Sequence, residues 1–286
     1  MKNSIEIKNV SKKYPGFALK NINFCVPEGT IVGLIGENGA GKTTTIKALL
    51  NIISSLGDIQ VLGKNIRKHE KEIKQDIGVV LDNSFLSEYL TTKKLNTIMK
   101  DFYNNWDEKK YMYYIKEFQL PENQLIKEFS SGMKMKLKIA IAISHHPKLL
   151  ILDEPTSGLD PIVRNEILEI FRKYIEEDET RAILISSHIT SDLEHISDYI
   201  VLIDKGEIKL DKATTELLEN YGIVKCSKED FEKIKIEDYI SYRAGKYQYE
   251  VLVADKYEFR RKYDISVIDR PTIEDIMLFY IKGGKA

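Results

Sequence analysis

One eight-residue segment, at positions 36–43, constrains this chain more than any other feature of its sequence. It reads Gly-Glu-Asn-Gly-Ala-Gly-Lys-Thr and fits G-x-x-x-x-G-K-[ST], the P-loop pattern. A short apolar run at 31–35 precedes it, and a helical pattern at 43–53 follows it. In this pattern a buried strand leads into a helix whose N-terminus faces bound phosphates. The segment therefore predicts an α/β fold with a nucleotide site.

Each residue type in this segment has a physical reason to be there. The glycines allow backbone conformations that a side chain forbids, so that successive N–H groups can turn inward around an anion. Lys42 supplies a point charge for the β- and γ-phosphates, and the Thr43 hydroxyl can bind Mg²⁺. We predict that ATP is held by the following residues: Gly36, Glu37, Asn38, Gly39, Ala40, Gly41, Lys42, Thr43 and Thr44.

A pair of carboxylates lies at the end of a second apolar run, at 149–154. The run Leu-Leu-Ile-Leu predicts a buried strand, and Asp153 and Glu154 follow it directly. We expect Asp153 to hold Mg²⁺ beside Thr43, and Glu154 to orient the water that attacks the γ-phosphate. Further along, Asp160 followed by Pro161 predicts a helix start, with an N-cap residue and then proline at the first helical position.

Composition narrows the class of protein. Hydrophobic residues make up 43% of the 286 positions and charged residues 30%, which is typical of a globular protein. The net charge of −1 argues against a general nucleic-acid-binding surface. Cys25 and Cys226 lie far apart, so neither a zinc site nor a disulfide framework is expected. The longest apolar run, 276–281, is too short to span a bilayer, and we expect a cytosolic chain.

Strand-like and helical segments alternate through most of the chain. Runs at 149–152, 182–185 and 199–203 are apolar throughout and separated by helices, which predicts a parallel sheet covered on both faces. An alternating segment at 4–10 predicts a half-exposed strand, with 19–26 as a candidate partner. Two further short runs, 59–62 and 77–81, are strand-like, and residues 91–142 are helical and rich in aromatics that we interpret as helix packing.

The last part of the chain shows a mixed α+β pattern. Residues 222–226, 234–239 and 247–253 read as strands, and residues 272–282 as a helix. Ser191 and Glu194 have the spacing of a capping box. From these patterns we predict a large domain at 1–218, with a helical subdomain at about 84–145, and a small accessory domain at 219–286.

Two further motifs stand on either side of the Asp-Glu strand. Phe129-Ser130-Ser131-Gly132-Met133 precedes it, and His188 follows the 182–187 segment. With the P-loop, these motifs resemble the ATP-binding-cassette (ABC) ATPases in their characteristic order, over roughly residues 3–215. The resemblance implies a P-loop ABC ATPase fold with a mixed core sheet, an antiparallel β-subdomain and a helical subdomain. It also implies ATP hydrolysis, with Glu154, His188 and Lys42 as the catalytic residues.

The resemblance also implies roles for residues outside the P-loop. Tyr14 stands where an aromatic ring stacks on adenine. Ser130 and Gly132 match positions that contact the γ-phosphate of ATP held by a second cassette, and Ser130 also reads as a helix cap. Asp160, in the D-loop, would touch that second cassette. Two cassettes then enclose two ATP molecules, as a homodimer or a heterodimer.

The chain departs from the family pattern at two places. The signature usually reads Leu-Ser-Gly-Gly-Gln, and here Phe129, Ser131 and Met133 replace the first, third and fifth residues. After the 77–81 run, Asp82 replaces the usual glutamine. A carboxylate there could bind Mg²⁺ with Thr43 and Asp153, but it cannot donate a hydrogen bond when ionised.

The resemblance leaves three functions open. The first is an ATP-hydrolysing subunit that energises a separately encoded polytopic membrane permease, on the cytoplasmic face of the membrane, with the signature spelling closest to drug, antibiotic and peptide exporters. The second is a soluble ABC ATPase acting on DNA or ribosomes, although the segment from Asp82 to Ser130 is too short for a long coiled coil. The third is a poorly hydrolysing cassette paired with an active one.

Overall fold

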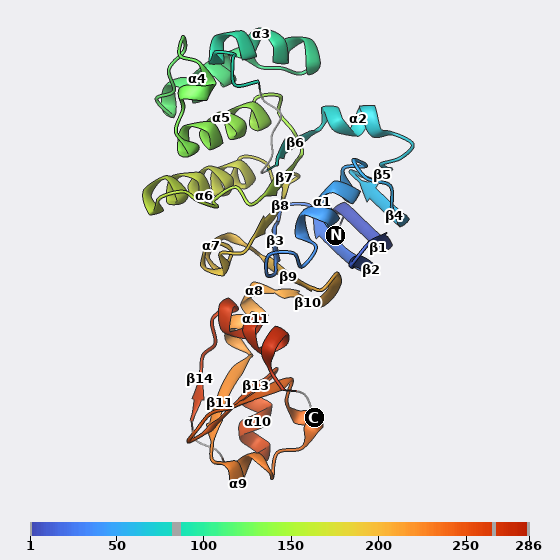
Figure 1. The fold of residues 1–286 in the computed structure, drawn as a ribbon, viewed down its shortest axis with the longest axis vertical. Coiled ribbons are helices and arrows are strands. Elements are labelled where there is room, and N and C mark those ends of the chain that lie inside the picture. Colours follow the sequence, from blue (N-terminus) through green and yellow to red (C-terminus); the bar gives the residue numbers. More distant parts are fainter. Residues whose placement is uncertain (1, 82–86, 265–266, 285–286) are drawn as a thin grey trace.

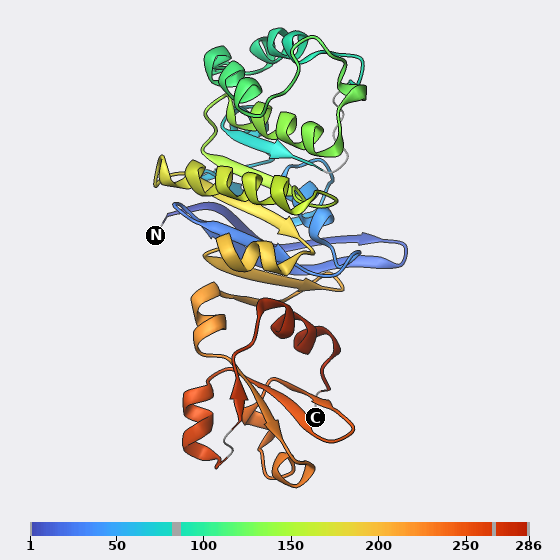
Figure 2. The same ribbon diagram turned by 90° about the vertical axis from the view of Figure 1, so that its left-hand side faces the viewer.

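The computed structural model describes residues 2–81, 87–264 and 267–284. Within them the chain forms an elongated molecule with three parts along its long axis (Figure 1). A group of helices lies at one end, a sheet-centred cassette core in the middle, and the C-terminal segment at the other end (Figure 2). Asp82 lies outside the described residues, so its predicted role in metal binding stays a prediction.

The core of the cassette is a six-stranded sheet with the order β10-β9-β3-β8-β7-β6. Every neighbouring pair is parallel except β9 and β10, which makes the sheet mixed, as predicted. Its central strands are buried on both faces, which is why they read as continuous apolar runs. The strands are β3 (Ile31–Ile35), β6 (Ile77–Val80), β7 (Leu149–Asp153), β8 (Ala182–Ser187), β9 (Tyr199–Asp204) and β10 (Glu207–Ala213).

A second, antiparallel sheet packs beside the P-loop helix, in the order β2-β1-β4-β5. The predicted partnership of the first two strands is confirmed, with Ile5 opposite Val26 and Ile7 opposite Phe24. The antiparallel sheet and α1 (Lys42–Leu49) pack against one face of the core sheet, and together they form a continuous apolar core. The strands are β1 (Asn3–Tyr14), β2 (Phe17–Pro27), β4 (Leu56–Val61) and β5 (Lys64–Asn65).

The P-loop helix is shorter than the sequence pattern predicted. It ends at Leu49, and Asn51 takes a positive φ of 55°. Asparagine tolerates this left-handed conformation better than most residues, so the chain turns away there. The short helix α2 (Glu70–Gln75) then leads into β6.

The helical subdomain has its own apolar core, built around the fully buried Tyr111. Most aromatics of the 91–142 segment pack there, as predicted, whereas Phe102 and Tyr113 are 67% and 58% exposed. Trp106 also donates a hydrogen bond to the Asn96 side chain. The elements are α3 (Thr92–Phe102), α4 (Glu108–Glu117), the 3₁₀ turn η1 (Ile126–Glu128) and α5 (Ser131–Ile143).

The opposite face of the core sheet is covered by α5, α6 (Pro161–Glu176) and α7 (Thr190–Ile196). Asp160 caps α6 by accepting hydrogen bonds from the N–H groups of Ile162 and Val163, as predicted. The capping box predicted for Ser191 and Glu194 is wrong, because α7 begins earlier and its N-cap residue is Ile189, which has no side-chain cap. The Glu194 carboxylate instead accepts a hydrogen bond from the backbone of Ile273.

The C-terminal segment forms an antiparallel sheet with the order β12-β13-β11-β14. Helix α11 begins with a capping box made by Thr272 and Asp275, close to where the sequence placed it. The strand predicted at 234–239 is wrong, because those residues contain the 3₁₀ turn η2 (Ile236–Asp238). The elements are α8 (Thr214–Glu219), β11 (Gly222–Cys226), α9 (Lys228–Phe231), β12 (Ser241–Ala244), β13 (Tyr249–Val253), α10 (Lys256–Lys262), β14 (Ile268–Asp269) and α11 (Ile273–Lys282). We call residues 222–284 the C-terminal unit; the predicted boundary after residue 218 stays a prediction.

Candidate ATP site

The P-loop connects β3 to α1 and depends on its glycines. Gly41, the N-cap residue of α1, has a φ of 120°, and Gly39 has a φ of 82°. A Cβ atom at Gly36 would lie 2.3 Å from the backbone oxygen of Ile203, which no side chain can tolerate. The loop therefore keeps its tight path because glycine alone fits these three positions.

Lys42 is the cation of the loop, and it is buried, with 5% of its surface exposed. Its Nζ donates hydrogen bonds to the carbonyl oxygens of Gly36, at 2.7 Å, and Glu37, at 3.3 Å. The same Nζ lies 3.2 Å from Oε1 of Glu154. The helix that begins at Lys42 also aims its first free N–H groups at this point, so the region is electropositive.

Glu154 is held by two elements of the fold. Its Oε1 faces Lys42, and its Oε2 lies 2.6 Å from Nδ1 of His188 and accepts a hydrogen bond from the His188 backbone N–H. Glu154 has a φ of 52°, which turns its side chain out of the line of β7. The fold thus brings Lys42, Glu154 and His188 together, three residues that lie far apart in the sequence.

Asp153 is 1% exposed and lies at the end of β7. Its Oδ1 accepts a hydrogen bond of 2.6 Å from the Ser186 hydroxyl, and the same hydroxyl accepts one from the backbone N–H of Glu154. Ser186 therefore positions the Asp153 carboxylate and the backbone of Glu154. The sequence analysis missed it, although a hydroxyl residue at the end of an otherwise apolar strand, next to β7 in a parallel sheet, was a usable signal.

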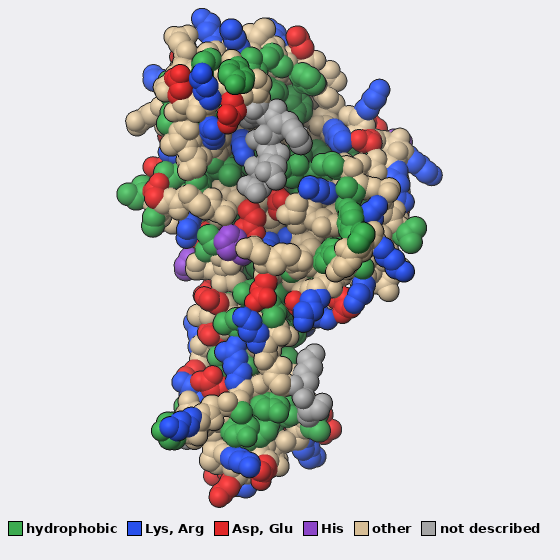
Figure 3. All heavy atoms as spheres, viewed as in Figure 1, with side chains coloured by type: hydrophobic (Ala, Val, Ile, Leu, Met, Phe, Trp, Pro, Cys, Tyr) green, Lys and Arg blue, Asp and Glu red, His purple; other side chains and the backbone are tan. Residues whose placement is uncertain are grey.

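A cavity of ≈ 860 Å³ lies over the P-loop. Figure 3 shows that histidine and acidic side chains gather at the middle of the cassette on this view. Tyr14 does not line the cavity; it is 42% exposed, and the Lys12 ammonium lies over its ring. The lining residues are Gly16, Phe17, Asn38, Gly39, Gly41, Lys42, Thr43, Thr44, Glu154, Ser157 and His188.

Three of these lining residues were not predicted: Gly16, Phe17 and Ser157. Gly16 lies in the turn between β1 and β2, and Phe17 is the first residue of β2. A Cβ on Gly41 would lie 3.1 Å from the Phe17 ring, so this end of the hairpin reaches the P-loop. Phe17 is therefore the aromatic ring at the cavity wall. The predicted stacking of Tyr14 on adenine stays a prediction.

Ser130, Gly132 and Asp160 do not line this cavity. Ser130 caps α5, as predicted, by accepting a hydrogen bond from the Met133 N–H. A Cβ on Gly132 would lie 3.4 Å from a methyl group of Val163 on α6, so the signature and the D-loop helix pack closely. The thirteen-residue helix α5 thus starts at a capped N-terminus remote from the chain's own cavity.

Fold and site together define a P-loop ATPase with a helical subdomain inserted into its core. Comparisons with known proteins give the family. Residues 19–157 match the family model described as ABC transporter. The bacitracin transport ATP-binding protein BcrA of Bacillus licheniformis is 37% identical over 217 residues, which cover 73% of this chain and 69% of that protein.

Other relatives agree. The lantibiotic transport ATP-binding protein SrtF of Streptococcus pyogenes is 37% identical over 216 residues, covering 73% of this chain and 90% of that protein. A solved ATP-binding subunit of an ABC transporter superposes with a TM-score of 0.68 at 28% identity, covering 74% of this chain and 91% of the other. The chain belongs to the ABC transporter ATP-binding family. It is the ATP-binding subunit of an ABC transporter and hydrolyses ATP for transport.

Proposed function

We propose that the cavity over the P-loop binds ATP with Mg²⁺ and that Glu154 orients the attacking water. One observation carries this proposal: the Glu154 carboxylate is held at the P-loop between Lys42, at 3.2 Å, and His188, at 2.6 Å. A carboxylate whose two oxygens are both held in place can align a water molecule without losing further conformational freedom during the reaction. Such positioning of the nucleophile is the main contribution of a protein to phosphoryl transfer.

The roles of the remaining residues follow from their chemistry. The backbone N–H groups from Gly36 to Thr44 surround the phosphates, and Lys42 contributes its charge to the β- and γ-phosphates. His188 fixes the orientation of Glu154 through Nδ1 and its backbone N–H. Ser186 links the Asp153 carboxylate to the backbone N–H of Glu154 through its hydroxyl.

The donors near the cavity fit a magnesium ion. The Thr43 hydroxyl and the buried Asp153 carboxylate are oxygen ligands, which Mg²⁺ prefers, and helix α1 packs against β7 so that their two elements are neighbours. When bound, the ion neutralises charge on the phosphate oxygens. Asp82, outside the described residues, is a third proposed ligand.

We propose further that two cassettes act together. Ser130, Gly132 and Asp160 lie away from the chain's own cavity, and the capped N-terminus of α5 is suited to bind an anion that another cassette presents. A copy of this chain, or a related cassette, would supply the phosphates.

We also propose that the chain works with a polytopic membrane permease at the cytoplasmic face of the membrane, and that the complex exports its substrate. Subunits of this family work with membrane permease components, and none of the helices within the described residues is long and apolar enough to span a bilayer. Relatives are named for the transport of bacitracin and of lantibiotics, and a third for linearmycin resistance. These names support an antibiotic or peptide as the exported substrate.

The test is Glu154→Gln in the complex extracted with detergent from native membranes. We expect a polytopic membrane protein to co-purify with the chain. We expect ATP binding to persist in the variant. ATP turnover should fall about 10²- to 10⁴-fold, because the amide cannot act as a base. Glu122→Gln, an exposed carboxylate in the helical subdomain, is the control and should leave turnover unchanged. Turnover at the parental rate would refute the role of Glu154, and recovery without a membrane protein would refute the permease partnership.

A further inference from the structure

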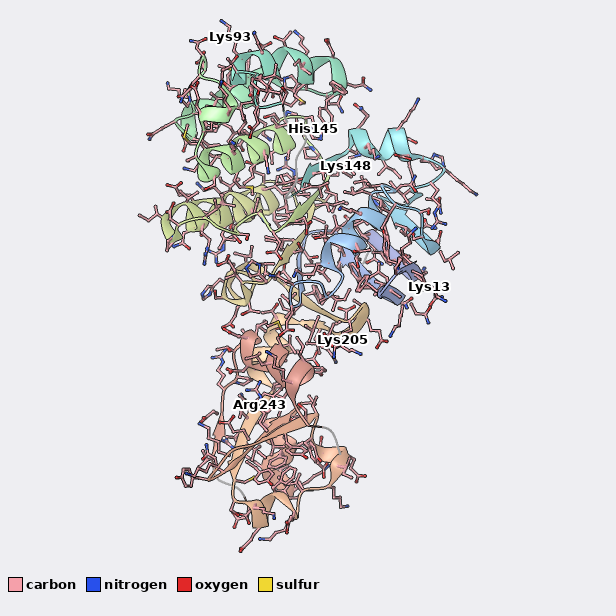
Figure 4. All side chains as sticks on the ribbon, in the orientation of Figure 1. Lys13, Lys93, His145, Lys148, Lys205 and Arg243 are labelled. Atoms are coloured by element: carbon pink, nitrogen blue, oxygen red, sulfur yellow. The ribbon has the colours of Figure 1, made fainter. Side chains whose placement is uncertain are left out.

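Helix α11 lies between the cassette and the sheet of the C-terminal unit (Figure 1). On one side its apolar residues join the same buried core as α6 and α7 of the cassette. On the other side Ser241 of β12 donates a hydrogen bond to the Phe279 carbonyl, and the Arg243 guanidinium lies 4.2 Å from the centre of the Phe279 ring. Figure 4 labels Arg243 in the region of this contact. The helix is therefore fixed from both sides.

Both ends of α11 reach elements of the ATP site. At its start, the N–H of Ile273 donates a hydrogen bond of 2.9 Å to the Glu194 carboxylate on α7, the helix that follows His188. At its other end, Nζ of Lys282 lies 3.2 Å from Oε1 of Glu37 in the P-loop. Charged side chains of both signs gather where the cassette meets the C-terminal unit (Figure 3).

Glu37 is the acidic residue of a loop that binds a polyanion. Its backbone carbonyl accepts hydrogen bonds from Lys42 Nζ and from the N–H of Ala40, so its main chain belongs to the phosphate-binding turn. An uncompensated carboxylate at this place would repel the phosphates of ATP through the Coulomb interaction. A cation beside Glu37 removes that repulsion.

We propose that Lys282 is a positioning residue of the ATP site, supplied by the C-terminal unit, and that it favours nucleotide binding by neutralising Glu37. The inference rests on the proposed function of the P-loop cavity. Because the two side chains are 62% and 46% exposed, the pair is a solvated one and its effect is modest. Its contribution is to affinity, since among the described residues the Glu154 carboxylate pairs with Lys42 and His188 and with neither Lys282 nor Glu37.

The experiment measures ATP affinity, KM and kcat for the full chain at low ionic strength, with variants at both residues. Lys282→Ala should weaken ATP binding about 2- to 5-fold with kcat unchanged, which is the range of exposed ion pairs. Lys282→Glu should weaken ATP binding further, and Lys282→Arg should keep the wild-type affinity. The effect should shrink at high salt because solvent ions screen exposed charges. Lys233→Ala, which removes an exposed ion pair with Asp230 elsewhere in the C-terminal unit, should leave affinity unchanged.

A double-mutant cycle separates this role from a structural one. In a Glu37→Gln background there is no carboxylate to neutralise, so Lys282→Ala should then have no effect on affinity. An equal loss in both backgrounds, or wild-type affinity in Lys282→Glu at low salt, would overturn the proposal. Lys42→Ala distinguishes a failure of the role proposed for Lys282 from a failure of the function proposed for the P-loop cavity. If it abolishes binding while Lys282→Glu binds normally, only the role of Lys282 fails; if it binds ATP normally, the proposed function fails.

Discussion

The cassette and the C-terminal unit are both built from a sheet with helices, yet they differ in how their sheets are made. The core sheet of the cassette is mostly parallel, so the carboxyl ends of its strands meet at one edge, where β3, β7 and β8 deliver the P-loop, the carboxylates and His188. The sheet of the C-terminal unit is antiparallel throughout, and its strand ends point both ways. In the first region, the candidate catalytic side chains from distant parts of the sequence therefore converge at one edge of the sheet.

The two regions are nevertheless joined through one core. Phe279, Ile276 and Ile273 of α11 belong to the same apolar cluster as Phe171 of α6 and Leu193 of α7. The C-terminal unit also has a separate cluster on the far face of its sheet, around Phe259. The comparison teaches that a region without a recognisable chemical motif can still contact the ATP site. The packing of α11 against the cassette places Lys282, at the end of that helix, beside the P-loop.

The largest effect expected on nucleotide binding is its loss in Lys42→Ala. Removing Lys42 deletes the cation of the P-loop, and we expect ATP affinity to fall at least about 100-fold, which corresponds to about 2.7 kcal/mol. Equilibrium binding of a fluorescent ATP analogue measures it. Lys47→Ala, on the same helix but outside the cavity lining, is the control. Unchanged affinity in Lys42→Ala would show that ATP binding by the cassette does not depend on its P-loop lysine.

Phe279→Ala tests the shared core. The side chain is 1% exposed between the two regions, and truncating a buried Phe costs about 3–5 kcal/mol of unfolding free energy. Denaturant unfolding, followed by probes in each region, should show both transitions shifted. Phe102→Ala, an exposed ring, should change stability by less than about 0.5 kcal/mol. A shift confined to the C-terminal unit would mean that the two regions are energetically separate.

Ser186→Ala tests a smaller contribution within the cassette. The variant loses the hydroxyl that contacts Asp153 and the backbone N–H of Glu154. Hydrogen bonds to charged groups contribute about 1.5–3 kcal/mol, so kcat should fall about 10- to 100-fold with ATP binding retained. Ser144→Ala removes a buried serine that caps the end of α5 away from the site, and serves as the control. A kcat equal to that control would assign Ser186 a purely structural role.

Much of the cassette could be predicted because its signals are local. The strand, turn and helix around the P-loop follow from apolar runs and glycines next to one another in the sequence. The caps at Ser130 and Asp160 depend on a side chain and N–H groups two or three residues away, and both predictions are confirmed. Where a pattern had two possible uses, prediction failed: Ser191 and Glu194 fit a capping box, but Glu194 binds the N–H of Ile273 instead.

By itself, the sequence determined the nucleotide-binding turn, the order of the motifs and the division into buried strands and amphipathic helices. These depend on backbone geometry and on periodicity, which act within a few residues. Only the tertiary structure decided that Ser186 contacts the Asp153 carboxylate and the Glu154 backbone, that Phe17 rather than Tyr14 lines the cavity, and that Lys282 meets Glu37. Such contacts join residues far apart along the chain, and packing of whole elements, rather than any local preference, sets the distance between them.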